Sequence, residues 1–234
     1  MSLLKFIKYE VPTKRKRKCF PIFESTNPIP IILSLYNTPE TNRRRNLLPR
    51  DGEVYFVPDF FNPEQSTNYF NALMEKADWQ QKQVEMYGKK LNVPRLTAWY
   101  GPSNKPYIYS GIKNEPTPWL PELLEIKKKV DEATGLCFTS VLLNLYRDGK
   151  DSVAWHRDNE HVLGKNPAIA SVSFGATRLF KLRHFEDKKL VRNFALSPGS
   201  FLLMAGETQH KWEHAVPKTA KKIGPRINLT FRVI

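Results

Sequence analysis

After Gly135 the chain alternates between short apolar segments and clusters of turn-forming residues. The clusters, such as Arg147-Asp148-Gly149 and Ser197-Pro198-Gly199, separate segments whose length and composition are typical of β-strands. We expect strands at 138–146, 152–156, 169–174, 178–183, 193–196, 200–205, 210–214 and 227–233. Eight short strands in roughly 100 residues predict an antiparallel sandwich or jelly roll.

Upstream of these strands the apolar residues recur at helical spacing in two segments. Asn62-Pro63-Glu64-Gln65 has the composition of a helix start, with Asn62 as the N-cap residue and Gln65 in the capping-box position. A second helix is expected at 121–134, ended by Gly135, and a strand is expected at 54–57. We therefore predict an α+β fold: a double-stranded β-helix (jelly roll) core backed by N-terminal helices.

The first 50 residues have a different texture, which predicts a basic and largely disordered arm. They contain the runs Lys14-Arg15-Lys16-Arg17-Lys18 and Arg43-Arg44-Arg45, and prolines interrupt them throughout. Their net charge is +8, out of +14 for the whole chain. Such a surplus favours a polyanionic partner such as nucleic acid, although a solvated basic surface without a specific partner would have the same composition. Residues 51–234 are expected to form the folded domain.

Other features of the composition predict an intracellular protein. No apolar run approaches the roughly 18 residues that a membrane-spanning helix needs, and the chain starts without a secretory signal. The two cysteines, Cys19 and Cys137, lie far apart and are expected to be reduced thiols. The compartment would be the nucleus in a eukaryote, where the basic run could act as an import signal, or the cytoplasm in a bacterium.

A candidate metal site lies at the end of the strand predicted at 152–156. His156 and Asp158 are two residues apart, so on a strand both side chains point to one face while Arg157 points away. A third ligand from a distant strand would complete the facial triad of two histidines and one carboxylate that non-haem Fe(II) oxygenases use. Alone, the H-x-D pattern is common by chance.

The C-terminal strand carries a second candidate site. Its apolar residues Ile227, Leu229 and Phe231 alternate with polar residues that share the opposite face. These polar residues are Arg226, Asn228, Thr230 and Arg232. If that face is buried, its arginines could bind the two carboxylates of a short dianion. The alternative is an exposed polar face on an edge strand, but Asn144 and Tyr146 repeat the pattern in another apolar strand.

Together these motifs resemble the AlkB family of dealkylating oxygenases. The resemblance rests on H-x-D, a later histidine and R-x5-R within Pro-Arg-Ile-Asn-Leu-Thr-Phe-Arg, and it extends from about Val54 to Ile234. It is greatest to the DNA-repair branch of the second human AlkB homologue. It implies an Fe(II)- and 2-oxoglutarate-dependent dioxygenase that uses O2 to demethylate bases such as N1-methyladenine and N3-methylcytosine in DNA. Formaldehyde is then released while 2-oxoglutarate is decarboxylated to succinate.

The resemblance also implies roles for single residues. Periodicity leaves both His210 and His214 open as the third metal ligand, but the family's ligand stands twelve residues before the first arginine, which here is His214. The metal would thus be held by His156, Asp158 and His214. The residues expected to bind 2-oxoglutarate are Asn144, Tyr146, Arg226, Asn228, Thr230 and Arg232. Arg226 would pair with the distal carboxylate, while Arg232 and Asn144 would lie nearer the metal.

The substrate residues implied by the resemblance come mostly from the N-terminal part of the domain. The residues expected to contact the damaged base or the duplex are Tyr87, Gly88, Lys89, Tyr107, Tyr109, Asn159 and Glu160. This chain departs from the closest branch at Tyr87 and Tyr109, where the branch has Phe, and at Asn159, where it has Asp. The tyrosines can stack much as phenylalanine does, whereas Asn159 removes a negative charge from the base pocket.

The resemblance divides the domain into a nucleotide-recognition part at 51–135 and a jelly-roll catalytic core at 136–234. The expected partner is alkylated DNA, and the protein is expected to be a monomer that does not bind membranes. Two alternatives remain open: the same chemistry on RNA or on a protein side chain, and a catalytically inactive sandwich that only binds nucleic acid.

Overall fold

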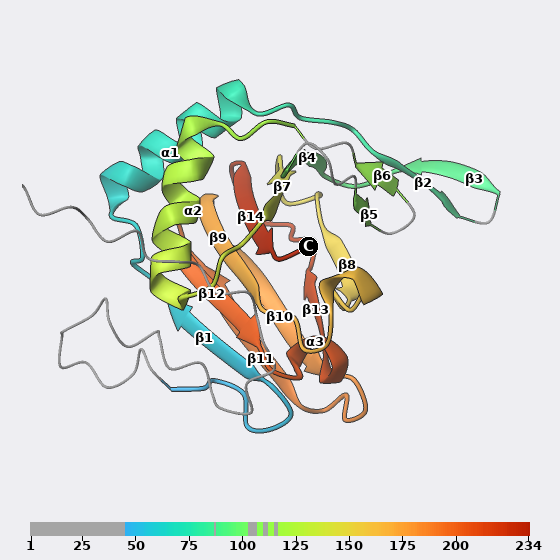
Figure 1. Ribbon diagram of the computed structural model, residues 1–234. Coiled ribbons are helices and arrows are strands. Elements are labelled where there is room, and N and C mark those ends of the chain that lie inside the picture. The colour runs from blue at the N-terminus through green and yellow to red at the C-terminus, as the bar shows by residue number, and fades with distance from the viewer. Residues whose placement is uncertain (1–44, 87, 103–106, 110–111, 115–116) are drawn as a thin grey trace, which may run out of the picture.

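Two stacked antiparallel sheets form the body of the protein in the computed structural model, which describes residues 45–86, 88–102, 107–109, 112–114 and 117–234 (Figure 1). The larger sheet has the strand order β1 (Glu53–Val57), β12 (Ser200–Ala205), β9 (Ile169–Gly175), β14 (Arg226–Arg232), β7 (Ser140–Tyr146) and β4 (Leu96–Tyr100). The smaller sheet has the order β11 (Val191–Leu196), β10 (Arg178–His184), β13 (Trp212–Val216) and β8 (Val153–His156). The predicted jelly-roll core is confirmed.

Two helices, α1 (Pro63–Lys76) and α2 (Pro121–Thr134), cover the outer face of the larger sheet (Figure 1). Asn62 caps α1 in a complete capping box with Gln65, and Gly135 ends α2 with a φ of 69° in the left-handed region. Because these caps satisfy backbone groups at the helix ends, the local sequence explains where α1 begins and where α2 ends. The predicted helix limits and the predicted backing of one sheet are confirmed.

The larger sheet separates two apolar cores, and the alternation of residues in its strands supplies both. In β7, Val141, Leu143 and Leu145 face the helices, whereas Tyr146 packs into the core between the two sheets. Both faces of this sheet are therefore buried, and every residue of β7 and β14 is buried. The polar residues of these strands consequently lie inside the sandwich rather than on an exposed edge.

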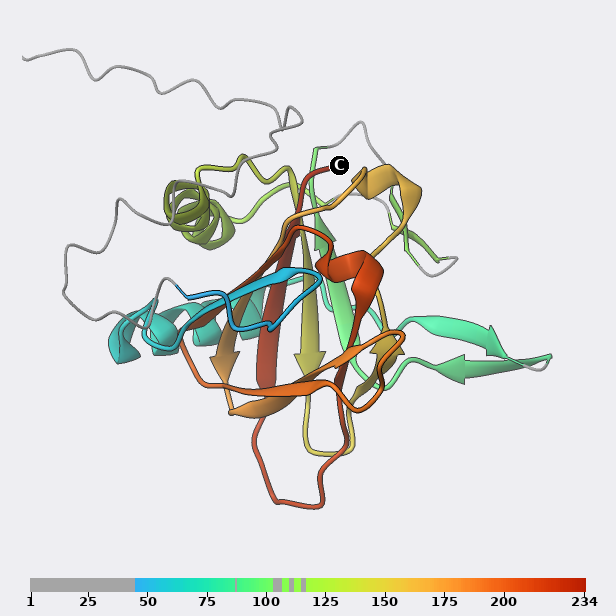
Figure 2. The ribbon, with the colours of Figure 1, turned by 90° about the horizontal axis from the view of Figure 1, so that it is seen from below.

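Several strands were not expected from the sequence. The strand predicted at 210–214 starts only at Trp212, because Thr208–Lys211 forms the short helix α3. In the N-terminal part, β4 joins the larger sheet beside β7, and two hairpins precede α2. These hairpins pair β2 (Gln83–Met86) with β3 (Lys89–Asn92), and β5 (Tyr107–Tyr109) with β6 (Ile112–Asn114). The hairpin β2–β3 extends away from the sheets (Figure 2). Every residue of β3 is exposed, so this strand lacks the apolar alternation by which a core strand is recognised in a sequence.

The last residues of the expected arm pack against the domain. Leu48 is only 5% exposed, the Asn46 amide accepts hydrogen bonds from the backbone of Leu48 and Val54, and Trp212 Nε1 donates to the carbonyl of Arg50. Residues 46–50 thus belong to the packed structure, while residues 1–44 lie outside the described residues.

The expectation of two reduced cysteines is wrong for Cys137, which is disulfide-bonded. Distance along the chain, on which that expectation rested, does not determine distance in space.

Within the ranges described, no helix has the length and apolar character needed to cross a membrane.

Candidate active site

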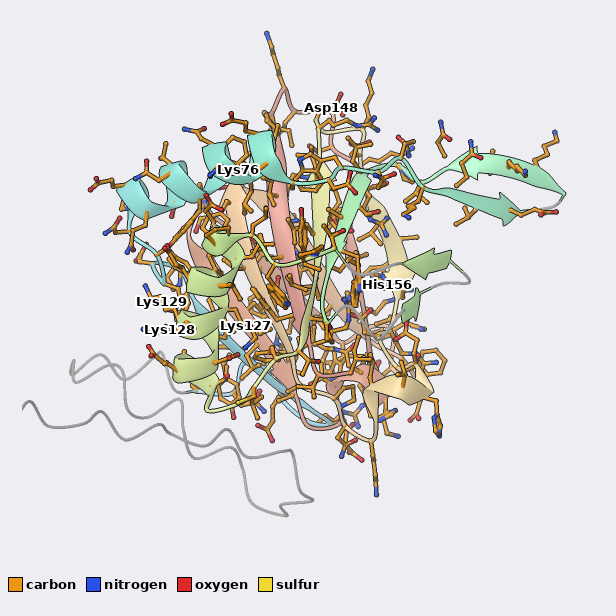
Figure 3. All side chains as sticks on the ribbon, turned by 45° about the horizontal axis from the view of Figure 1, so that its top comes forward. Lys76, Lys127, Lys128, Lys129, Asp148 and His156 are labelled. Carbon is orange, nitrogen blue, oxygen red and sulfur yellow. The ribbon has the colours of Figure 1, made fainter. Side chains whose placement is uncertain are left out.

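Three side chains that could hold a metal converge at one end of the cavity between the sheets. One ligand-type atom from each of His156, Asp158 and His214 lies within 4.8 Å of the others. His156 and His214 stand directly opposite each other in the pairing of β8 with β13, with ring centroids 4.2 Å apart. The sheet register therefore places two histidines from segments far apart in sequence side by side. Figure 3 shows His156 away from the basic residues Lys127, Lys128 and Lys129 of α2.

The hydrogen bonds and charges around these residues leave their ligand atoms available to bind a metal cation. His156 Nδ1 lies 2.8 Å from the carbonyl oxygen of Ala154. Because a carbonyl only accepts, Nδ1 donates this hydrogen bond, and Nε2 is the ring nitrogen left to bind a metal. Burial, helped by His156 and opposed by Asp158, lowers the pKa of His214 to about 3, so this ring is neutral at pH 7.

Asp158 remains a carboxylate although it is only 1% exposed. Burial by itself would raise its pKa, but Arg232, His214 and His156 together hold the pKa well below its usual range. Arg232 Nη2 donates to Asp158 Oδ2 at 2.5 Å. The other carboxylate oxygen, Oδ1, is buried and has no hydrogen-bond partner among the residues that the structure describes. That oxygen faces the cluster, 3.8 Å from His156 Nε2.

The polar face of β14 continues the cavity away from this cluster. Arg226 Nη2 donates to Asn228 Oδ1 at 2.7 Å and to Ser173 Oγ at 2.8 Å, and Asn228 Nδ2 donates to Thr230 Oγ1 at 2.9 Å. The guanidinium of Arg226 lies 5.2 Å from the ring centre of Tyr146, and burial lowers its pKa to about 10, so it is still a cation at neutral pH. The cavity is lined by all six residues predicted to bind the cosubstrate: Asn144, Tyr146, Arg226, Asn228, Thr230 and Arg232.

Three polar residues in or beside the cavity were not identified from the sequence. Arg95, directly before β4, is 9% exposed and donates through Nε to Asn144 Oδ1 at 2.8 Å. Ser171 lines the cavity from β9, and both Ser171 and its neighbour on the same face, Ser173, donate to Asn228 Oδ1. The alternation in Ala-Ser-Val-Ser-Phe could have revealed the serines as a polar face. Arg95 had no comparable signal, because a single arginine before a strand is common.

The ambiguity between the two C-terminal histidines is resolved by position. His210 lies on α3, where its Nε2 accepts from the backbone N–H of Asn166 at 3.3 Å and its carbonyl accepts from Arg157. Arg157 points away from the cluster, as expected, and stacks on Phe185 at 3.9 Å. His214, not His210, thus faces His156 and Asp158.

The predicted substrate residues are only partly visible. Tyr87 and the side chains of Tyr107 and Tyr109 lie outside the described residues, whereas Gly88 and Lys89 form the turn and the start of β3 in the projecting hairpin. Asn159 is exposed. Glu160 is half-buried, and burial, together with nearby Asp158, raises its pKa. The assignment of these residues to a base pocket stays a prediction.

The donor set fits Fe(II) and a short dianion. Two histidines and a carboxylate leave coordination positions open in the geometry of non-haem iron sites, and Asp158 Oδ1 is a buried anion directed at the cluster. At the far end, Arg226 Nε and Nη1 are buried without a hydrogen-bond partner in the described part of the chain. A buried guanidinium with unused donors is the complement of a carboxylate.

Comparison with known proteins agrees with this donor set. The family model described as the 2OG-Fe(II) oxygenase superfamily matches residues 53–232. The chain belongs to this superfamily. A relative from Bos taurus, alpha-ketoglutarate-dependent dioxygenase alkB homolog 3, is 42% identical over 190 residues, which cover 77% of this chain and 66% of the relative. The DNA oxidative demethylase ALKBH2 of Mus musculus is 39% identical over 179 residues, covering 73% of this chain and 72% of that protein.

These relatives confirm the resemblance to the AlkB family, and they include alkB homolog 3 as well as the ALKBH2 branch. The match to the bovine protein spans just under two thirds of its length. Among solved structures, that of OsALKBH1 superposes with a TM-score of 0.55 at 18% identity, covering 76% of this chain and 97% of that one. This superposition supports the shared fold of the oxygenase superfamily.

Proposed function

We propose that this protein is an Fe(II)- and 2-oxoglutarate-dependent dioxygenase that removes alkyl groups from N-alkylated bases in DNA. The observation that carries the proposal is the arrangement within one buried cavity: His156, Asp158 and His214 at one end, and the unused donors of Arg226 at the other. A dicarboxylate of the length of 2-oxoglutarate could reach from a metal at the first end to the guanidinium at the second.

Each end of the cavity has a distinct task in this proposal. His156, Asp158 and His214 would hold Fe(II), which supplies the O2-dependent oxidation coupled to decarboxylation of 2-oxoglutarate. Arg226 would bind the distal carboxylate, with its guanidinium oriented by Asn228 and Ser173. Arg232 has a different task from Arg226. It already pairs with Asp158 and thereby keeps that ligand ionised. Arg232 and Asn144 would border the end of the cosubstrate nearer the metal.

Alkylated DNA is the proposed substrate because of the relatives and the charge. The relative ALKBH2 is named a DNA oxidative demethylase, and this chain carries a net charge of +14, which favours binding to a polyanion. N1-methyladenine and N3-methylcytosine are cationic bases, so the carboxylate of Glu160 is suited to bind them. Tyr107, Tyr109 and Asn159 would complete the base pocket, and Tyr87, Gly88 and Lys89 would contact the duplex.

The division of the chain is part of the same proposal. Residues 51–135 would recognise the nucleic acid, 136–234 would form the catalytic core, and the basic arm would hold phosphates. A monomer acting in a nucleus or a bacterial cytoplasm is consistent with this assignment.

The test is a reaction with defined oligonucleotides. The protein is incubated with Fe(II), 2-oxoglutarate and single- or double-stranded DNA containing N1-methyladenine or N3-methylcytosine, and formaldehyde and succinate are measured together. We expect equal amounts of both products above the level without oligonucleotide. Asp158→Ala should abolish both, because it removes the only carboxylate of the triad.

Matched methylated RNA oligonucleotides decide between the two substrates. If formaldehyde is released faster from RNA than from DNA, RNA and not DNA is the preferred substrate. Binding of oligonucleotides without any succinate would instead indicate an inactive nucleic-acid-binding protein.

A further inference from the structure

The backbone of Asp158 is held by the side chain of Gln209, which is not one of the residues that line the cavity. β8 ends at His156, so Asp158 lies beyond the strand, where no ladder hydrogen bond fixes its peptide. Its backbone N–H donates instead to Gln209 Oε1 at 3.0 Å. One residue earlier, Arg157 Nη1 donates to the carbonyl of His210 at 3.0 Å. Two consecutive residues of the ligand loop are thus bound to α3.

Gln209 is itself held in one orientation. It is fully buried, with 0% exposure, and its Nε2 contacts Met204 Sδ at 3.4 Å, which leaves its oxygen directed at Asp158. The preceding residue anchors α3 to β1, because Thr208 Oγ1 accepts from the backbone N–H of Glu53 at 2.8 Å and donates to the carbonyl of Ala205 at 2.5 Å. The acceptor that Asp158 uses therefore belongs to a rigid part of the sandwich.

We propose that Gln209 is a positioning residue that sets the place of the Asp158 carboxylate for metal binding. The segment from Thr208 to His214 then serves two of the three ligands: it carries His214 directly and fixes Asp158 through Gln209. This inference rests on the proposed function, since it assumes that the cluster binds a divalent metal.

The position of Asp158 needs such a support because its carboxylate is subject to an unbalanced attraction. Arg232 holds Oδ2 at 2.5 Å, while Oδ1 has no hydrogen-bond partner in the described ranges. If the peptide of Asp158 could shift, the carboxylate would move toward the guanidinium and away from the two histidines. Removal of residues that orient metal ligands typically weakens metal affinity about 10- to 100-fold.

The test compares metal binding by the full-length protein and its Gln209→Met variant. Methionine matches glutamine in length and volume but lacks the acceptor oxygen. The dissociation constant for Mn²⁺ is measured by titration calorimetry without oligonucleotide, and Co²⁺ binding is followed by its visible absorption bands. We expect a loss of about 10- to 100-fold in affinity and a change in the Co²⁺ bands.

His210→Ala is the matched control, because it alters the adjacent side chain of α3 without removing a bond to Asp158. Its metal affinity should equal that of the wild type. If Gln209→Met does not fold, as judged by circular dichroism, Gln209→Asn replaces it, since its oxygen falls short of Asp158 by one methylene. A folded Gln209 variant that binds Mn²⁺ as tightly as the wild type, with unchanged Co²⁺ bands, overturns the inference alone. Failure of the wild type to bind either metal overturns the proposed function and this inference with it.

Discussion

Burial shifts the pKa values of the ionisable residues of the cavity, but it leaves each of them in a form that can bind a metal or a dianion. It lowers the pKa of His214 to about 3, which keeps the ring neutral, and lowers the pKa of Arg226 to about 10, which leaves the guanidinium charged at pH 7. Burial by itself would raise the pKa of Asp158, but Arg232, His214 and His156 together hold it below its usual range. At neutral pH each side chain is thus in the protonation state that its proposed role requires.

Arg226→Ala should raise the KM for 2-oxoglutarate far more than the KM for the oligonucleotide. Charge-assisted hydrogen bonds contribute about 1.5–3 kcal/mol each, so a loss of about 10- to 100-fold is expected. The measurement is succinate formation as a function of 2-oxoglutarate at saturating oligonucleotide. Arg192→Ala, on β11 and outside the cavity, is the control and should leave both constants unchanged. An unaltered KM for 2-oxoglutarate in Arg226→Ala would refute the carboxylate role.

At the scale of elements, the loops that connect the strands near the Arg226 end of the cavity are held together by buried charged groups. Arg178, only 3% exposed, donates to the carbonyls of Asp148, Asp151 and Pro217, and so binds the β7–β8 turn to the loop after β13. Within the turn, the Asp151 carboxylate accepts from the backbone and from the guanidinium of Arg147. These contacts hold the ends of four strands together, although none of their side chains is a proposed ligand.

Asp151→Asn should lower the free energy of unfolding by about 1.5–3 kcal/mol at pH 7, the contribution of hydrogen bonds to a charged group. Burial raises the pKa of Asp151, but the bonds from Arg147 outweigh it and the pKa lies below its ordinary value. A lowered carboxyl pKa stabilises the fold above the unfolded-state value of about 4, and this stability is lost as the pH falls through the folded-state value.

Denaturant unfolding of the wild type and Asp151→Asn at pH 7 and at pH 3 measures this difference. The two proteins should differ at pH 7 and converge at the acidic pH. Asp59→Asn removes an exposed carboxylate and should change little at either pH. A difference that grows as the pH falls would contradict the sign of the shift.

The hairpin β2–β3 is the element best placed to contact a duplex, because it projects from the sheets and its strand β3 is exposed (Figure 2). Gly88, between β2 and β3, has a φ of 70° that suits glycine, and Tyr87 lies outside the described residues. Lys89 and Lys90 follow on β3 and could hold phosphates.

Tyr87→Ala should lower activity on double-stranded DNA about tenfold and on single-stranded DNA only slightly. Extracting a base from a duplex costs a few kcal/mol, and an inserted ring recovers part of this cost only where a base stack exists. The initial rates of formaldehyde release from both substrates are compared. Leu91→Ala, an exposed residue of the same hairpin, is the control. Equal losses on both substrates would mean that Tyr87 supports the fold or the pocket instead.

At the scale of the whole molecule, the charge is concentrated in the N-terminal segment. Residues 1–44 contain nine Lys or Arg and three Glu, whereas the proposed site residues all lie beyond residue 86. Because residues 46–50 pack on the domain, a truncation that tests the arm should end before them.

Deletion of residues 1–44 should weaken binding to every DNA sequence about equally and flatten its salt dependence. Each lost phosphate contact reduces the slope of log K against log salt by roughly 0.9 on B-DNA. Fluorescence anisotropy at several salt concentrations measures the slope. Turnover of a saturating short oligonucleotide by the truncated protein is the control and should persist. A collapse of turnover in a folded truncated protein would place the arm in the catalytic domain.

Local signals in the sequence determined several helix ends and the polar face of one strand. The caps at Asn62 and Gly135 defined where α1 starts and α2 ends, and the strict alternation in β14 placed its polar residues on one face, because caps and pleats depend on neighbouring residues alone. The family motif text then supplied the choice of His214 over His210, which periodicity left open.

The tertiary structure alone decided which residues meet. The pairing of β8 with β13 sets His156 opposite His214, and β4 brings Arg95 to Asn144, a contact between residues 49 positions apart. α3 interrupts a predicted strand and thereby directs Gln209 to Asp158. No local pattern encodes these contacts, since they depend on sheet register and on the packing of segments that are distant in the chain.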